Sequence, residues 1–169
     1  GSSLKAVVLA SQAVALDDAS CIVAGGQESM TNGPYLLPQA RQGYRLGHGT
    51  LLDATVHDGL WCALGDYHMG NTGDLVSERY NVSREDQDAW AVRSHQRAAA
   101  AAERGDFDAE IVPVEIPQRK GDPIIFAADE TIRADSTVEA LAGLRPVFNK
   151  DGTVTAGNSS PMNDGAAAA

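Results

Sequence analysis

The sequence has few cysteines and no long hydrophobic run. Its 169 residues contain two cysteines, Cys21 and Cys62, and four histidines. Two thiols fit neither a disulfide framework nor a metal-binding pattern, and the histidines show no metal-ligand spacing. We therefore expect reduced thiols and no metal. No apolar run approaches the roughly 20 residues of a membrane span, and no signal-peptide pattern is present, so we expect no membrane association.

Positive charge is also scarce. Lys and Arg number 13 against 23 Asp and Glu, which gives a formal net charge of −10. This balance argues against nucleic acid or an anionic membrane as the main partner, because both need a basic face. An anionic small molecule held by a few local cations is still compatible with it, and Arg119, Lys120, Arg133 and Arg145 are candidates. The alternative for these four is a set of surface ion pairs, each worth little.

No serine-hydrolase elbow and no Walker-type phosphate loop is present. The most site-like stretch is GNSSPMNDG (residues 157–165), where small residues would let a ligand approach the backbone. A tight turn with Ser and Asn as caps explains it equally well. In YHMG (residues 67–70), taken alone, a surface histidine and a core methionine are the simpler interpretation.

The order of the elements predicts an α/β fold. Residues 4–16 are apolar on nearly all sides, which predicts a helix buried all round and ended by Asp17 and Asp18. CIVAGG (residues 21–26) predicts a buried strand in which Cys21 is packed, and a helix followed by such a strand is typical of a parallel α/β layer.

Further along, the pattern predicts helices at 53–64, from Asn71 or Thr72 to Tyr80, and from an N-cap at Ser83 to a stop at Gly105. Leu75, Val76 and Tyr80 would form the apolar face of the second of these helices. Other expected elements are strands at 110–117 and 124–126, a brief helix in VEALAGL, a short strand in GTVT and a small-residue helix in the final DGAAAA. Both ends begin or stop within an element, so we expect an internal piece of a longer chain.

Several dispersed stretches together resemble the thiolases, the acetyl-CoA C-acyltransferases. They are GSSLKAV, VAGGQESM, HDGLW, YHMG, SREDQDAWAVRSHQRA, DAEIVPVEIPQRKGD, DETIR, LRPVF with KDGTVTAGN, and NDGAAAA. Their order and spacing are kept over the whole length. The resemblance implies a layered α/β fold in which residues 1–30 end the first core half, 31–161 form an inserted, CoA-binding loop domain, and 162–169 begin the second core half.

The resemblance also implies an activity: condensation of two acetyl-CoA molecules, or cleavage of 3-ketoacyl-CoA, through an acyl-cysteine. The nucleophilic cysteine would immediately precede Gly1, and the other catalytic groups would lie in the later half, so no catalytic residue is assigned within these 169. Coenzyme A thioesters would be substrates and no cofactor is implied. The implied protein is cytoplasmic, acts in fatty acid metabolism, and is a dimer or tetramer (a homotetramer in our assignment).

The same resemblance assigns substrate contacts residue by residue. The pantetheine tunnel would be lined by Leu60, His68, Met69, Phe148, Ala156, Ser159 and Ser160. Arg133 would lie near the adenine and phosphate end of CoA. Ser160 would hydrogen-bond a pantetheine amide, and Met69 would close a short acyl pocket, which implies acetoacetyl-CoA specificity.

Three positions depart from the family pattern: Ser3 and Pro161 stand where it has Gly, and Ser159 where it usually has Ala. Pro161 lacks an N–H and has a fixed φ. The alternative function is a non-catalytic thiolase-like subunit that binds acyl-CoA or serves a structural role; a chain expressed in this form would be a third case.

Overall fold

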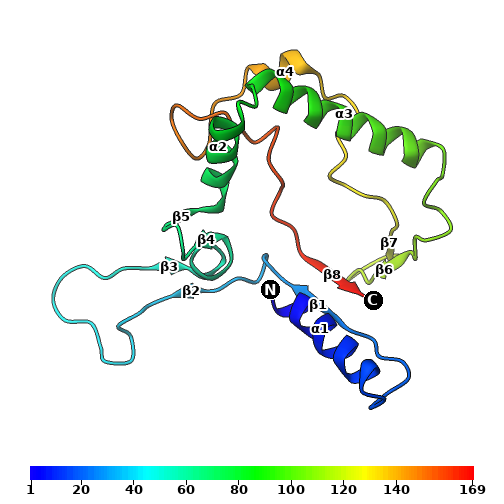
Figure 1. Ribbon diagram of the computed structural model, residues 1–169, viewed down its shortest axis with the longest axis horizontal. Coiled ribbons are helices and arrows are strands. Elements are labelled where there is room, and N and C mark those ends of the chain that lie inside the picture. Colours follow the sequence, from blue (N-terminus) through cyan, green and yellow to red (C-terminus); the bar gives the residue numbers. More distant parts are fainter. The chain divides into compact units, whose positions relative to one another are not determined.

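The computed structural model describes all 169 residues as a mixed α/β chain in two compact units (Figure 1). The first unit comprises Gly1–Met69 and Ser160–Ala169, and the second comprises Gly70–Ser159. The division at residues 31 and 161 follows the family's domain scheme and stays a prediction. No helix of the chain is both long and apolar enough to cross a membrane.

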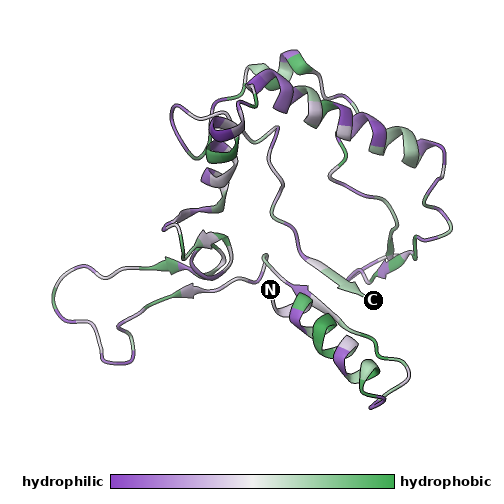
Figure 2. Cartoon of the chain, viewed as in Figure 1, coloured by the Kyte–Doolittle hydropathy of each residue, from purple (hydrophilic) through white to green (hydrophobic).

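The first unit begins with helix α1 (Ser2–Ala15), which ends as expected where Asp17 takes a left-handed φ of 60°. The prediction that this helix is buried all round is wrong, since none of its residues is buried and Leu4 is 71% exposed. Helix α1 is largely hydrophobic (Figure 2) and contacts β1 (Gly25–Glu28). A helix is buried on all sides only if it has neighbours on more than one side, and in this unit α1 packs against β1 on one side only. A cavity of about 300 Å³ lies on that side of α1, lined by Val7, Ala10, Ser11, Val14, Ile22, Ala24 and Ala169.

The strands form four two-stranded pairs, all antiparallel, so the predicted parallel layer is wrong for this chain. Strand β1 pairs with β8 (Gly165–Ala168). The first strand thus starts four residues later than expected, and Cys21 is exposed instead of packed.

The final alanines form β8, so the helix expected there is also wrong. Alanine favours helix, but a short run is a poor helix on its own. Pairing with β1 supplies a ladder of backbone hydrogen bonds, extended by Ala24 and Ala169 at 3.0 and 2.8 Å. This long-range pairing outweighs the local preference.

Two further pairs complete the first unit. They are β2 (Tyr35–Leu36) with β3 (Leu52–Asp53), and β4 (Trp61–Cys62) with β5 (Tyr67–His68). The helix expected at 53–64 is confirmed only for Thr55–Leu60, a π-helix labelled η1. Chain reversal at Asp66, whose φ is 55°, lets Trp61 and Cys62 form a strand instead of continuing the helix.

The second unit is built on α2 (Met69–Tyr80), α3 (Arg84–Glu103), α4 (Val138–Ala142) and the hairpin of β6 (Val114–Ile116) and β7 (Ile124–Phe126). The predictions for α3, β7 and α4 are confirmed, and β6 is shorter than expected. The Ser83 hydroxyl accepts from the Asp86 N–H at 3.1 Å, and Gly105 ends α3 with a φ of 72°.

Helix α2 begins two residues before the expected Asn71, and Leu75, Val76 and Tyr80 are exposed instead of forming its packed face. The chain packs instead against Gly73 of α2, where an added Cβ would meet Val154. The predicted strand in GTVT is absent. The core of this unit consists of Val92, Leu141 and Val154 with buried Asp88, Ser136 and Thr155.

Candidate substrate-binding site

Residues 147–159, here called the strap, follow α4 and carry three of the assigned substrate contacts. The N–H of Val147 donates to the Val154 carbonyl at 3.0 Å, which closes the first half of the strap into a loop. Phe148 lies in that loop with its ring against the Cα of Gly70, where a Cβ would overlap the ring. A side chain at position 70 is thus incompatible with this placement of Phe148.

Asp74 of α2 anchors the middle of the strap. Its Oδ1 accepts the N–H groups of Thr153 and Val154 at 2.7 and 3.0 Å. Its Oδ2 is buried without a hydrogen-bond partner. These backbone N–H groups are paired with a carboxylate instead of a neighbouring strand, which is the physical reason why GTVT forms no strand.

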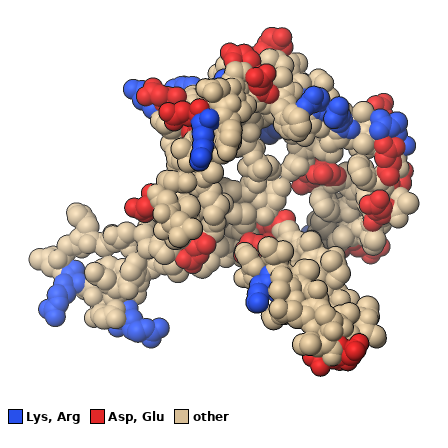
Figure 3. Space-filling view, viewed as in Figure 1, with Lys and Arg blue, Asp and Glu red and all other residues tan.

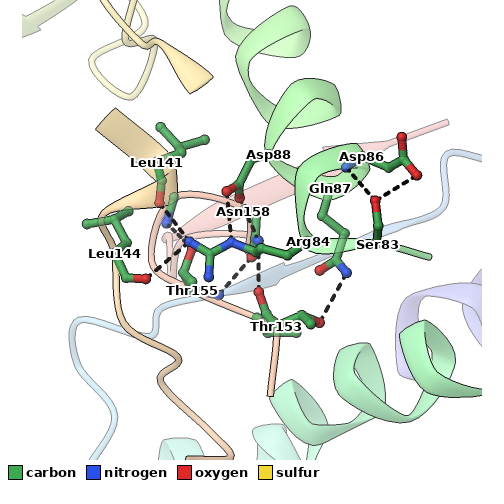
Figure 4. Close-up of polar contacts among 12 residues, drawn as sticks. Ser83, Arg84, Asp86, Gln87, Asp88, Leu141, Leu144, Thr153, Thr155 and Asn158 are labelled. Carbon is green, nitrogen blue, oxygen red and sulfur yellow. Dashed lines mark hydrogen bonds and ion pairs between the residues drawn. The ribbon is translucent and has the colours of Figure 1, made fainter. Parts of the chain in front are cut away.

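Asp88 of α3 anchors the second half of the strap through a polar network (Figure 4). The Asp88 side chain is 2% exposed, and its Oδ2 accepts from Arg84 Nε at 2.8 Å. Its Oδ1 accepts from Asn158 Nδ2 at 3.0 Å. Both carboxylate oxygens are therefore paired, as a buried charge requires.

Asn158 and Arg84 extend this network to backbone groups. Asn158 Nδ2 also donates to the Thr153 carbonyl at 3.1 Å, and its Oδ1 accepts the Thr155 N–H at 2.8 Å. Arg84 Nη2 donates to the carbonyls of Leu141 and Leu144, at 2.7 and 3.1 Å, where α4 ends. The strap and the end of α4 are thus tied to one buried ion pair.

The strap presents its assigned residues differently. Ala156 is exposed, whereas Phe148 and Ser159 are half-buried. The Ser159 hydroxyl donates to the Thr155 carbonyl at 2.7 Å. Its proton is used within the strap, so towards a ligand Ser159 can act only as an acceptor.

Arg133 lies elsewhere in the same unit and is exposed. Its backbone N–H donates to His95 Nδ1 of α3 at 3.2 Å. No ion pair forms at Arg133, nor at the other three basic candidates, so the surface ion-pair alternative is wrong for all four. The paired basic side chains are His57, Arg84 and Arg104.

The remaining assigned residues belong to the first unit. Trp61 of β4 pairs with His68 of β5, so Leu60 and Met69 leave the same end of this ladder. Leu60 and His68 are half-buried, and Met69 is 49% exposed. The fold therefore brings Leu60, His68 and Met69 together; Ser160 lies in the other, C-terminal segment of this unit and is exposed.

Asn158 lies within the site-like stretch 157–165 that the sequence predicted, but Asp74, Arg84 and Asp88 were not predicted to be parts of the site. The one available signal was the spacing of four between Arg84 and Asp88, which places the two charges on the same face of α3 and predicts an ion pair. Nothing in the sequence links either aspartate to the strap, because the partners lie about 70 to 80 residues further along.

Two comparisons place this architecture among the thiolase-type acyltransferases. A crystal structure of the Bacillus anthracis acetyl-CoA acetyltransferase is 43% identical, with a TM-score of 0.87. The Syntrophomonas wolfei acetyl-CoA acetyltransferase is 44% identical, with a TM-score of 0.91. Each match covers 98% of this chain and 41% of the other.

The family assignment rests on a match that extends over the whole length of the chain. Residues 1–169 match the family described as the thiolase N-terminal domain, so the chain belongs to the thiolase family. Among curated relatives, the acetyl-CoA acetyltransferases of Pseudomonas aeruginosa and Cupriavidus necator are 56% and 52% identical over 168 residues. Each alignment covers 99% of this chain, which spans 43% of the relative's length.

Proposed function

We propose that this chain is the acyl-CoA-binding part of an acetyl-CoA C-acetyltransferase. The observation that carries the proposal is the match of all 169 residues to the thiolase N-terminal family, together with 56% identity to an acetyl-CoA acetyltransferase. In the proposed domain scheme, residues 31–161 form the inserted loop domain that binds CoA.

The proposed reaction uses an acyl-cysteine. A cysteine thiolate attacks the carbonyl carbon of one acetyl-CoA, and the CoA thiolate leaves. A base then removes a proton from the methyl group of a second acetyl-CoA, and the carbanion attacks the acyl-cysteine. The new carbon–carbon bond forms as the bond to sulfur breaks, giving acetoacetyl-CoA and the free cysteine; cleavage is the reverse.

The proposed nucleophile stands at the N-terminal end of α1, immediately before Gly1. Helix α1 has no acidic residue in its first turn and no side-chain cap, so its first N–H groups and the positive end of its dipole act unopposed on a group there. Both effects stabilise a thiolate.

Substrate binding is assigned to the residues of this chain. In the proposed arrangement Leu60, His68 and Phe148 contact the pantetheine arm together with Ala156, Ser159 and Ser160, and Met69 closes the acyl pocket. The exposed Arg133, which forms no ion pair with a carboxylate, binds the phosphate end of CoA through charge-assisted hydrogen bonds.

Assembly and location complete the proposal. We propose that the protein is a homo-oligomer, a dimer or tetramer, and that it is cytoplasmic. The loop between β2 and β3 supports assembly, because it exposes Leu37, Tyr44 and Leu46 and carries Arg41 and Arg45 without an acidic residue. Figure 3 shows blue basic side chains over this loop. The two free cysteines fit a reducing compartment.

The test is thiolysis by the complete protein that carries this sequence. Acetoacetyl-CoA and a long-chain 3-ketoacyl-CoA are each cleaved with CoA, and CoA binding is measured by calorimetry. We expect preference for the four-carbon substrate, and a Met69→Ala variant that gains relative activity on the longer one. Long-chain preference would overturn the short-chain specificity. CoA binding without turnover would instead support a non-catalytic acyl-CoA-binding subunit.

A further inference from the structure

Asp88 occupies a position that its own helix does not explain. A carboxylate in the second turn of α3 could pair with Arg84 alone at an exposed site, as many helical ion pairs do. Here the side chain is almost completely buried, and its second oxygen receives Asn158 from the strap. Burial of a charge is unfavourable unless its partners are well placed, so the hydrogen bond from Asn158 stabilises the buried Asp88 carboxylate as well as the strap.

Asn158 connects the Asp88 carboxylate to the backbone of the strap. Its amide bonds both Thr153 and Thr155, and Thr155 is 0% exposed. The Thr155 carbonyl in turn receives the Ser159 hydroxyl. One buried carboxylate therefore fixes the backbone that presents Ala156 and Ser159.

We infer that Asp88 and Asn158 are positioning residues for the pantetheine-binding strap, and that their contact sets the affinity for CoA thioesters. The inference rests on the proposed function. Neither side chain is proposed to touch substrate, since Asp88 is buried and both of its oxygens are used within the protein. Their effect reaches the substrate through the strap.

The two variants Asn158→Ala and Asp88→Asn break the contact from opposite sides. Asn158→Ala leaves the Arg84–Asp88 pair in place, so α3 keeps its tie to the end of α4 and this variant tests the strap by itself. Asp88→Asn places a donor against either Arg84 or Asn158. The matched control is Asp108→Asn, because Asp108 is exposed, lies outside the strap, and its carboxylate makes no ion pair.

The readout is KM for CoA in thiolysis, compared with kcat, in the complete protein. A shifted strap misplaces several contacts together, so KM should rise about tenfold in both variants, with a smaller change in kcat. A merely structural role reduces the amount of folded protein, which lowers apparent kcat and leaves KM unchanged. The double variant should be no worse than the more affected single variant, because both remove the same contact.

The outcomes separate this inference from the proposed function. Unchanged KM in Asn158→Ala, with an active wild-type protein, overturns the inference alone. So does a rise of equal size in Asp108→Asn, which would show a general charge effect. A wild-type protein that neither binds CoA nor cleaves a thioester overturns the proposed function and this inference with it.

Discussion

The Asp74 carboxylate lies directly against the Cα of Gly152, so that a methyl group at this glycine would overlap it. The carboxylate can then reach the N–H groups of the next two residues, Thr153 and Val154. A glycine thus permits a close approach between a helix and an irregular segment, and the carboxylate replaces the hydrogen bonds that a strand would supply.

Gly152→Ala should destabilise the second unit. The added Cβ must displace the Asp74 carboxylate, whose Oδ2 is already buried without a partner, and overpacking of this kind costs about 1–3 kcal/mol. Chemical denaturation measures the change in free energy of unfolding. Gly143→Ala is the control: its φ of −74° suits alanine and its nearest atom is an ordinary 3.6 Å away, so it should be neutral or slightly stabilising. Equal losses in both variants would contradict the packing argument.

The N-cap of α3 allows a prediction whose effect on the free energy of unfolding can be given in size. The Ser83 hydroxyl accepts the Asp86 N–H and donates to its carboxylate at 2.8 Å. Ser83→Ala removes this cap and should lower the free energy of unfolding by about 1 kcal/mol, whereas Ser83→Asn keeps an acceptor and should lose only a few tenths. A thermal melt of both variants decides it, and indistinguishable melting temperatures would show that the cap contributes nothing.

Local signals explain what the sequence predicted correctly. Helix α3 was predicted because Ser83 and Gly105 mark its ends within the same segment, and α4 and β7 are similarly local. Strand β8 was missed because its conformation depends on β1, more than a hundred residues away. The prediction that α1 is buried was wrong for a related reason. Hydrophobic residues indicate that a helix face should be covered, but they do not identify the segment that covers it.

The residues of the candidate site also fall into a group that could be assigned from the sequence and a group that could not. The family resemblance assigned the strap residues Phe148, Ala156 and Ser159 from neighbouring motifs, and their role in binding stays a prediction. What holds the strap was not predictable, because Asp74 and Asp88 resemble ordinary solvated helix charges. Only the fold shows that each carboxylate turns to a backbone or side chain about 70 to 80 residues further along.

Asp164 gives a pH-dependent prediction in the first unit. The N–H of Thr31 donates to its carboxylate at 2.8 Å, and this bond is the main reason that the pKa of Asp164 is lowered; Ser29 adds a weaker hydroxyl bond at 3.3 Å. A pKa lowered on folding means that the unfolded state binds more protons. The stabilisation is therefore present above the unfolded-state pKa of about 3.9 and is lost as pH falls through the lower folded-state value.

Asp164→Asn should remove this dependence. Denaturation of both proteins between about pH 5 and pH 3 should show a difference in unfolding free energy that narrows as the pH falls. The asparagine can still accept from Thr31, so the variant should fold and the comparison isolates the charge. A difference that stays constant over this range would show that the carboxylate does not titrate as the structure implies.

His95 supports Arg133 through a single hydrogen bond, which can be removed and restored. The imidazole Nδ1 accepts the Arg133 N–H at 3.2 Å, and the oxygen of an asparagine side chain can reach a similar position. Under the proposed function, His95→Ala should raise KM for CoA about fivefold, corresponding to one net hydrogen bond of about 1 kcal/mol, while His95→Asn should stay close to wild type. Because Arg133 would bind phosphate, the effect on KM should also shrink for a pantetheine thioester that lacks the nucleotide. An equal rise in KM for both variants, or for both substrates, would show that His95 acts on something other than Arg133.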